Sequence, residues 1–324
     1  MKPKTNKAAI IDLCNKINKK DGEGTIYTVG SKYANLKMDR WSTGIDDLDE
    51  IIGGGMPCGR VVEIWGAPSH GKTSLGYHLC SRHEMCLNIP IEGGYNEERA
   101  RVFGNTPKQM LIYRARYGED AFNKILKFSQ NGIPLILVDS VPSMIPKDDV
   151  DKMLKAAEKD TIEQQRVGGV SGLFTKYLPP IEDVIEKTGT TIIFINQVRD
   201  KVGALPFGEQ THTMGGHKLE HADSLKIRVA RRAWIEIPNK NPKNTAANEK
   251  VGLIIKCKVD KSKVCNPGME CEIPMFFDRG FVSFDDVPAI RKELMEKAAE
   301  KYSKRKSKQY DEDIDDDWDE ESEE

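Results

Sequence analysis

The sequence predicts an α/β protein with a mostly parallel central sheet, and three observations lead to this fold class. Apolar runs of strand length recur at residues 61–65, 86–91, 110–113, 134–138 and 191–195. Stretches with helical periodicity lie between them, at about 72–83, 96–103, 119–130 and 173–187. Long polar stretches, expected to be loops, follow the ends of two predicted strands, at 147–170 and 198–216. Alternating strands and helices build a buried sheet covered on both faces, and such sheets bind ligands at the strands' carboxyl ends.

Length and composition limit the class of protein. The chain has 324 residues, enough for one large domain with appendages or for two domains. No apolar run approaches the roughly 18 residues of a membrane span, and the N-terminus lacks a signal-peptide core. Seven cysteines occur without a C-x-x-C pair, which favours reduced thiols over zinc or disulfides. We therefore expect a cytoplasmic protein that does not contact a membrane.

The first 35 residues predict a helix followed by a short strand. Residues 3–20 place apolar side chains on one helical face, namely Ile10, Leu13, Cys14 and Ile17. Residues 25–29, rich in β-branched side chains, predict the strand. The apolar face needs a partner, either the chain's own core or a neighbouring subunit. We expect residues 1–35 to be an oligomerisation arm.

The core is expected to span residues 36–286. A helix begins near 42–49 and stops at the glycines 53–55. Pro179 and Pro180 fall inside a later helical stretch and should kink or restart it. Beyond residue 217, further runs predict strands that extend the sheet in antiparallel fashion, at 224–230, 252–259, 271–277 and 281–284.

The C-terminal residues divide into a basic helix, 287–310, and an acidic tail, 311–324. The tail holds eleven acidic residues and no Lys or Arg, a composition typical of disordered segments. The whole chain has a net charge of only −2, so the rest of the chain is net positive. A tethered polyanion can compete with another polyanion for that basic surface. The alternative is a tail that only improves solubility.

Residues 66–73, GAPSHGKT, fit the phosphate-loop motif G-x-x-x-x-G-K-[ST] between an apolar strand and a helix. In that context the backbone N–H groups cradle phosphates, and the helix N-terminus adds positive charge. Lys72 is expected to reach the β- and γ-phosphates, and Thr73 to ligate Mg²⁺. We therefore expect ATP and Mg²⁺ as ligands of the loop residues, namely Gly66, Ala67, Pro68, Ser69, His70, Gly71, Lys72, Thr73 and Ser74.

Three further strand ends carry side chains suited to ATP hydrolysis. Asp139 ends the apolar run 135–138, a Walker B pattern, and is expected to hold Mg²⁺ together with Thr73, with Ser140 in support. Glu92 follows another strand and could deprotonate the attacking water. Gln197 follows a third and could sense the γ-phosphate, although spacing alone favours an ordinary strand-end amide.

With these motifs in place, the sequence resembles the RecA recombinase family from about residue 8 to about residue 285. The resemblance is carried by STGIDDLD at 42–49, GGGMPCGRVVEIWGAPSHGKTSL at 53–75, LILVDSVPSMIPK at 135–147 and TTIIFINQVRDKVG at 190–203. It implies a RecA-like ATPase core and a DNA-dependent ATPase. Such proteins form helical filaments on single-stranded DNA and exchange strands with homologous duplex DNA. Implied partners are DNA of both kinds, further copies of the chain and single-strand-binding protein.

The resemblance also implies roles for individual residues. Glu92 falls on the catalytic glutamate, and Gln197 on the glutamine that links ATP to DNA binding. Lys256 and Lys258 match a pair reaching the neighbouring subunit's γ-phosphate, although from the residues alone they only share a strand face. The nucleotide site extends to Asn96 and Arg99. Residues 148–168 and 198–216 match two DNA-binding loops, with expected contacts from Arg166, Arg199, Lys201, Phe207, Gly215 and Gly216.

Several positions depart from the family pattern. Arg99 stands where the family has a tyrosine that stacks on adenine, and Gly172 and Pro179 stand where it has arginines near DNA phosphates. Glu220-His221 replaces a lysine–phenylalanine pair used between subunits. The first DNA loop is longer, and only the basic helix and acidic tail replace the usual C-terminal lobe. A shortened lobe is compatible with a phage-encoded member.

Two alternatives remain open beside a recombinase. A RecA-type ring helicase shares the phosphate loop, but the long second loop and the pair of Lys256 and Lys258 favour a recombinase. A non-catalytic mediator that binds DNA or a recombinase fits the departures. The presence of every expected hydrolysis residue argues against it, namely Lys72, Glu92, Asp139 and Gln197.

Overall fold

The structure is a computed structural model that describes residues 6–28, 30–31, 38–157, 169–200, 211–239 and 248–300. These residues fall into two units that divide between Asp39 and Arg40. Several predictions lie outside the described residues, namely those for Arg166, Lys201, Phe207, the side chain of Arg199 and the acidic tail.

The N-terminal unit contains helix α1, Lys7–Asp21, capped by Asn6, whose side chain accepts a hydrogen bond from the N–H of Ala9. The strand predicted at 25–29 is wrong for residues 25–28, which form no strand. Instead, the amide of Asn18 donates to the carbonyl of Ile26 at 2.8 Å and accepts from its N–H at 2.7 Å. A side chain therefore takes the place of the neighbouring strand that these backbone groups require.

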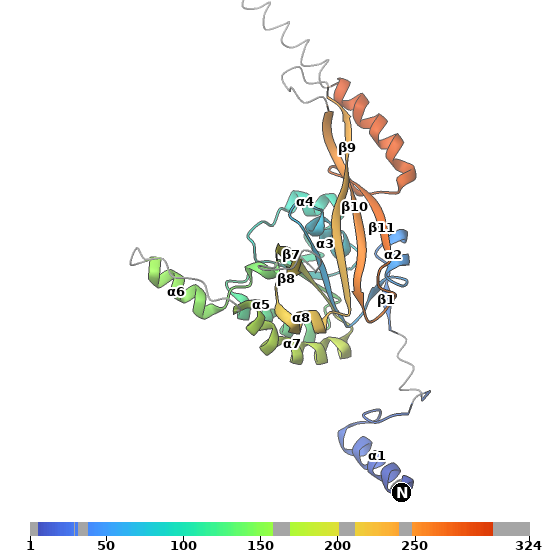
Figure 1. Ribbon diagram of the computed structural model, residues 1–324, viewed down its shortest axis with the longest axis vertical. Coiled ribbons are helices and arrows are strands. Elements are labelled where there is room, and N and C mark those ends of the chain that lie inside the picture. Colours follow the sequence, from blue (N-terminus) through green and yellow to red (C-terminus); the bar gives the residue numbers. More distant parts are fainter. Residues whose placement is uncertain are drawn as a thin grey trace, which may run out of the picture. The chain divides into compact units, whose positions relative to one another are not determined.

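One large sheet organises the second unit, with strand order β12-β11-β10-β9-β3-β7-β6-β4-β5 and β8 beside β7 (Figure 1). The strands from β9 to β5 in this order are parallel, and the others pair antiparallel. The predicted fold class is therefore confirmed. The bounds are β3 Val61–Gly66, β4 Cys86–Pro90, β5 Met110–Ile112, β6 Leu135–Asp139, β7 Thr191–Asp200, β8 Thr211–Thr213, β9 Leu225–Pro238, β10 Asn248–Ser262, β11 Glu270–Phe276 and β12 Gly280–Phe281. A separate two-stranded sheet pairs β1, Arg40–Trp41, with β2, Met56–Pro57.

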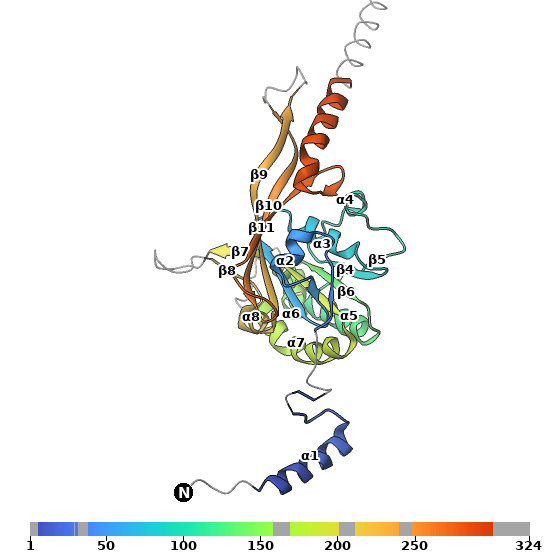
Figure 2. The ribbon, with the colours of Figure 1, turned by 90° about the vertical axis from the view of Figure 1, so that its right-hand side faces the viewer.

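Helices cover both faces of the parallel strands (Figures 1 and 2). One face packs against α2 (Asp46–Ile51), α3 (Lys72–Cys80) and α4 (Glu97–Val102), and the other against α5 (Gly118–Gln130), α7 (Gly169–Thr188) and α8 (Gly216–Ala222). Successive strand residues point to opposite faces, so β7 gives Ile193 and Ile195 to one core and Ile192 and Phe194 to the other. Strands buried on both faces are mostly apolar, which explains why nearly continuous apolar runs predicted them.

Both segments predicted to be irregular loops contain regular structure. Lys147–Ala157 forms helix α6, with Asp148 and Asp149 in the first turn, where the helix dipole favours acids. Strand β7 continues to Asp200 and pairs antiparallel with β8. The base of the 198–216 segment is therefore a hairpin.

Helix α7 passes through Pro179 and Pro180 without a break, so the predicted restart does not occur. Leu178 and Ile181, on either side of the prolines, are buried in the same core, and this packing holds the helix together. Residues 287–300 are helical, as expected. Two short 3₁₀ turns, η1 (Val141–Ser143) and η2 (Phe284–Asp286), complete the elements of the described residues. None of the helices within the described ranges has the length and hydropathy to cross a bilayer.

Candidate nucleotide-binding site

The carboxyl ends of four parallel strands meet at one edge of the sheet. The register places Gly66 of β3 opposite Gln197 of β7. It also places Asp139 of β6 opposite Ile195 of β7 and Pro90 of β4. Residues from distant parts of the sequence are thereby gathered at one edge. We call five of them the phosphate-edge cluster, namely Lys72, Thr73, Glu92, Asp139 and Gln197.

The loop between β3 and α3 has the backbone conformation of an anion site. Ser69 and Gly71 adopt positive φ angles of 60° and 93°. Helix α3 begins at Lys72, so its first N–H groups have no carbonyl partner within the helix. These donors and the positive end of the helix dipole face the same opening, an arrangement that favours phosphate.

Close packing requires glycine at the start of the loop. A Cβ atom on Gly66 would lie 2.1 Å from the carbonyl oxygen of Val229 in β9, far inside contact distance. A Cβ on Gly71 would lie 3.0 Å from the Ile255 side chain of β10. The loop is therefore seated directly against the antiparallel part of the sheet.

The side chain of Lys72 is held over its own loop. It is buried, and its ammonium group donates to the carbonyl of Ala67 at 2.7 Å. Burial lowers the pKa of Lys72, while the negative charges of Asp139 and Glu92 act to raise it. A phosphate oxygen entering the loop can replace the Ala67 carbonyl as acceptor, so the lysine is placed ready for an anion.

Thr73, Asp139 and Ser140 present oxygen atoms suited to Mg²⁺. The Thr73 hydroxyl donates to Asp139 at 2.7 Å. Burial raises the pKa of Asp139, opposed by this hydrogen bond and by Lys72. The buried hydroxyl of Ser140 has no hydrogen-bond partner among the described residues. Mg²⁺ prefers oxygen ligands, so these groups fit it, with Thr73 and Asp139 as the holding residues.

Glu92 and Gln197 contact each other directly. The Gln197 side-chain amide donates to a Glu92 carboxylate oxygen at 2.8 Å. Glu92 is exposed, and the backbone N–H of Ile91 beside it bonds to the Asp139 carbonyl at 2.7 Å. The residue expected to activate water therefore touches the residue expected to sense ATP.

A pocket of about 270 Å³ opens beside the phosphate loop, lined by Ser69, Gly71, Lys72, Thr73, Ser74, Arg99, Trp234, Leu253, Met275 and Phe277. The Arg99 guanidinium donates to the Phe277 carbonyl at 2.9 Å and to the Ser74 hydroxyl at 3.3 Å. Burial lowers the pKa of Arg99. Asn96, also predicted for the nucleotide site, is not among the residues that line this pocket. Its side chain caps α4 by accepting a hydrogen bond from the Arg99 N–H at 2.8 Å. Sequence reasoning missed Trp234 and Phe277, and their only signal was aromatic character in late strands.

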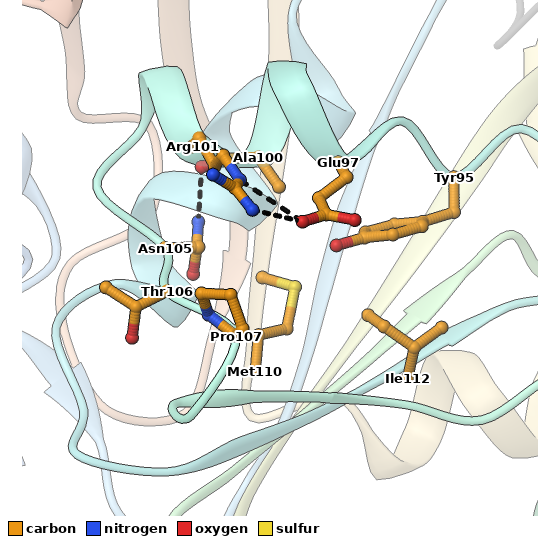
Figure 3. Close-up of a pocket in the computed structure, with 9 residues that line it drawn as sticks. All are labelled: Tyr95, Glu97, Ala100, Arg101, Asn105, Thr106, Pro107, Met110 and Ile112. Atoms are coloured by element: carbon orange, nitrogen blue, oxygen red, sulfur yellow. Dashed lines mark hydrogen bonds and ion pairs between the residues drawn. The ribbon is translucent and has the colours of Figure 1, made fainter.

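A second pocket of about 200 Å³ lies between α4 and the segment leading to β5 (Figure 3). The ion pair of Arg101 and Glu97 and the amide of Asn105, which donates to the Ala100 carbonyl at 3.0 Å, are part of its wall (Figure 3). No residue predicted for the nucleotide site lines it.

Lys256 and Lys258 lie on β10, away from the loop of their own chain. Side chains alternate along the strand, so Ile255 and Cys257 enter the core and the two lysines face the other side. The Lys256 ammonium forms an ion pair with Glu270 at 2.7 Å. The structure therefore does not bring these lysines to the phosphate-edge cluster of the same chain.

The predicted DNA-binding glycines begin helix α8. Gly215 and Gly216 have φ angles of 107° and 69°. A Cβ on Gly216 would lie 2.7 Å from the side chain of Ser171 in α7, and one on Gly215 would lie 2.6 Å from Leu219. Packing of α8 therefore requires both glycines. The backbone of Arg199 pairs with that of His212 in the hairpin.

Sequence reasoning also missed Glu63, an acid in the apolar run of β3. Its side chain is fully buried and bonds to Asn196 of β7. One charged residue within a doubly buried strand was the available signal, because buried charges require partners. Among the described residues no group of three or more His, Cys, Asp or Glu forms a metal site, and all seven cysteines are free thiols.

Comparison with known proteins identifies the family of the chain. The family model of the RecA N-terminal domain matches residues 8–282. The chain is 33% identical over 282 residues to Protein RecA of Wolinella succinogenes, covering 85% of this chain and 75% of that protein. It is 31% identical over 282 residues to Protein RecA of Campylobacter fetus and to that of Sulfurimonas denitrificans, covering 85% of this chain and 76% of each relative. The chain therefore belongs to the RecA family.

Proposed function

We propose that the protein is an ATP-dependent recombinase that forms helical filaments on single-stranded DNA and catalyses homologous pairing and strand exchange. Membership of the RecA family supports this proposal. The observation that carries it is the contact between Glu92 and Gln197 at 2.8 Å. It joins the proposed hydrolytic base to β7, the strand that leads into the second DNA loop.

The phosphate-edge cluster supplies the groups that ATP hydrolysis requires. Lys72 exchanges the Ala67 carbonyl for phosphate oxygens. Thr73 and Asp139 would hold Mg²⁺, which would supply positive charge beside the phosphates. Glu92, exposed at the end of its strand, accepts a proton from the attacking water.

Gln197 connects the nucleotide to DNA binding. Its side-chain amide, which donates to Glu92 here, can turn and donate to the γ-phosphate instead. Such a change of acceptor would shift β7 at Gln197. This residue lies three positions before Asp200, where β7 ends its pairing with β8 and the chain enters the second DNA loop. Loss of the γ-phosphate would then loosen the loop and release DNA, an order–disorder switch.

Binding to DNA would rest mainly on Arg and Lys contacts to backbone phosphates, from residues such as Arg166, Arg199 and Lys201. Such binding is salt-sensitive and largely independent of sequence. Base pairing between strands supplies the sequence recognition. The acidic tail at 311–324 would compete with DNA for this basic surface.

Two features favour assembly of several copies. Lys256 and Lys258 face away from their own phosphate loop, which supports a role at the γ-phosphate of a neighbouring subunit. Helix α1 exposes Ile10 and Leu13 at 49% and 56%, which supports a role of the arm in covering an adjacent copy. We accordingly assign 1–35 to the arm, 36–286 to the ATPase core, 287–310 to the basic helix and 311–324 to the tail.

The deciding experiment measures ATP hydrolysis with and without single-stranded DNA, for the wild type and for Glu92→Gln. We expect strong stimulation by DNA and a loss of about 10²-fold or more in the variant, because general-base catalysis contributes at least this much. Glu97→Gln is the matched control, since Glu97 is an exposed acid in an ion pair with Arg101. Strand exchange between homologous DNAs is the assay that follows.

Other outcomes point to the alternatives. Weak hydrolysis that ignores DNA and is unchanged by Glu92→Gln would favour a mediator, in keeping with the departures at Arg99, Gly172 and Pro179. Closed six-membered rings in electron micrographs without DNA would favour a ring helicase.

A further inference from the structure

A charged residue lies at the centre of the sheet, where apolar side chains are the rule. Glu63 on β3 is 0% exposed. One of its carboxylate oxygens accepts from the Asn196 amide at 2.9 Å, and the other lies 2.8 Å from the Lys226 ammonium of β9. An acid in this position is tolerated only because these partners compensate for lost hydration.

The same two partners hold the segment that ends the second DNA loop. Asn196 donates to the Met214 carbonyl at 2.6 Å and accepts from the Met214 N–H at 3.3 Å. Lys226 donates to the hydroxyl of Thr213 at 2.9 Å. Thr213 and Met214 directly precede the two glycines that begin α8. The interactions of Glu63 therefore reach the returning end of that loop.

A second acid, Asp223, completes this group. It follows α8 directly, is 0% exposed and lies against the carboxyl group of Glu63. Within the described part of the chain, neither of its oxygens receives a hydrogen bond from a donor. Two ionised carboxylates are acceptors only, whereas one proton turns the contact into a hydrogen bond. We call Glu63, Asn196, Asp223 and Lys226 the buried carboxyl cluster.

The surroundings favour a proton on Asp223. Burial and the neighbouring charge of Glu63 raise the pKa of Asp223 well above its ordinary value. The opposing positive charges come from Lys226 on β9 and Lys261 on β10. Lys261 is engaged by the Glu220 carbonyl, and burial lowers its pKa. With Asp223 neutral, Glu63 and Lys226 balance as one ion pair.

We propose that Asp223 is a positioning residue for DNA binding: its protonated carboxyl group donates to Glu63, so that Asn196 and Lys226 hold Thr213 and Met214 at the base of the second DNA loop. This role rests on the proposed function, since it assumes that the loop binds DNA. Glu63 lies three residues before Gly66, so the cluster also ties the base of the DNA loop to the strand that ends in the phosphate loop.

Removal of the proton has a defined consequence. At alkaline pH, ionised Asp223 places a second negative charge beside Glu63, and the two acids then compete for Lys226. The bond from Lys226 to Thr213 weakens, and the base of the loop loosens. DNA affinity therefore falls as the pH rises. Asp223→Asn has the same shape and keeps a donor to Glu63, but it cannot ionise. The part of the alkaline fall in DNA affinity that comes from Asp223 should therefore be absent in this variant.

The first test detects the proton directly. The infrared spectrum of the full-length protein at neutral pH should contain a carboxylic acid C=O band that Asp223→Asn removes. Asp120→Asn is the matched control, because Asp120 is also buried, at 7% exposure. Although burial acts to raise it, hydrogen bonds from Tyr113 and Arg116 lower the pKa of Asp120. Its replacement should remove only a carboxylate band. An acid C=O band of equal intensity in the wild type and in Asp223→Asn overturns the proposal.

The second test measures binding of a fluorescent single-stranded oligonucleotide by anisotropy from neutral to alkaline pH. The wild type should lose about tenfold more affinity over this range than Asp223→Asn, since one disrupted buried interaction corresponds to such a factor. Titration of lysine side chains changes the DNA affinity of both proteins equally, so it does not contribute to the difference between their pH profiles. Equal profiles would overturn the positioning role alone. Absence of DNA binding by the wild type at every pH would overturn the proposed function as well.

Thr213→Val keeps the test decisive if Asp223→Asn does not fold. This variant removes only the hydroxyl that Lys226 bonds, so the acid band should remain while DNA affinity falls about fivefold. Unchanged affinity in Thr213→Val would also contradict the proposal.

Discussion

The phosphate-edge cluster and the buried carboxyl cluster meet at neighbouring residues of β7, Gln197 and Asn196, but bond their polar groups differently. In the first, Lys72 bonds a carbonyl of its own loop, and Glu92 is exposed and bonded by Gln197. In the second, Glu63 and Asp223 are 0% exposed and every contact is internal. Groups that await a ligand carry bonds that a ligand can replace, whereas groups that hold the structure are sealed from water. Substitutions in the two clusters should therefore have opposite effects on stability and activity.

Glu63→Ala should have the largest effect on stability. It leaves the largely buried side chain of Lys226 without its carboxylate, and removal of one partner from a buried ion pair costs about 3–5 kcal/mol. The free energy of unfolding, measured by urea denaturation, should fall by this amount. Glu92→Ala is the control and should change it by less than about 0.5 kcal/mol. Equal losses in both variants would remove the distinction between the clusters.

Lys72→Ala should separate activity from stability. Burial of the ammonium group already disfavours its charged form, so its loss should change the free energy of unfolding by about 1 kcal/mol or less. ATP turnover should nevertheless fall by about 10²-fold or more, because an electrostatic contact to the transferred phosphate is lost. Lys127→Ala, on the exposed face of α5, should retain activity. Unfolding of Lys72→Ala at ambient temperature would contradict this assignment.

Lys256→Ala should affect the fold least of the three. Its ion pair with Glu270 is exposed, and exposed pairs contribute little. The melting temperature should stay unchanged. If Lys256 acts on a neighbouring subunit, turnover should fall only under conditions in which the wild type assembles, and mixing the variant with wild type should lower activity per subunit. Equal turnover at all protein concentrations would place Lys256 outside the site.

The parallel half of the sheet could be predicted closely from the sequence. Strands buried on both faces are mostly apolar, so runs such as 61–65, interrupted by Glu63 alone, and 191–195 predicted β3 and the start of β7. The phosphate loop could be predicted equally well, because the residues of its motif are consecutive in the sequence. Glu92 and Gln197 could be placed at one edge, since carboxyl ends of parallel strands meet there.

Other features depend on contacts that a linear pattern does not contain. Glu63 and Asp223 are separated by 160 positions, and only the pairing of β3 with β9 brings them together. Residues 25–28 have β-branched character, but the Asn18 side chain takes their backbone bonds. Helix α6 was missed because its polar composition resembles a loop, although its first-turn acids are a helix signal.

The register of β3 against β7 limits how the chain can change in length during evolution. Gly66 lies opposite Gln197, and Glu63 lies opposite Phe194. Insertion of a single residue within β7 would reverse the facing of every later side chain, and Asn196 would no longer reach Glu63. Insertions between α6 and α7, or between β7 and β8, leave that register intact. Lineages can therefore vary the length of these two connections while the residues of the phosphate-edge cluster keep their alignment.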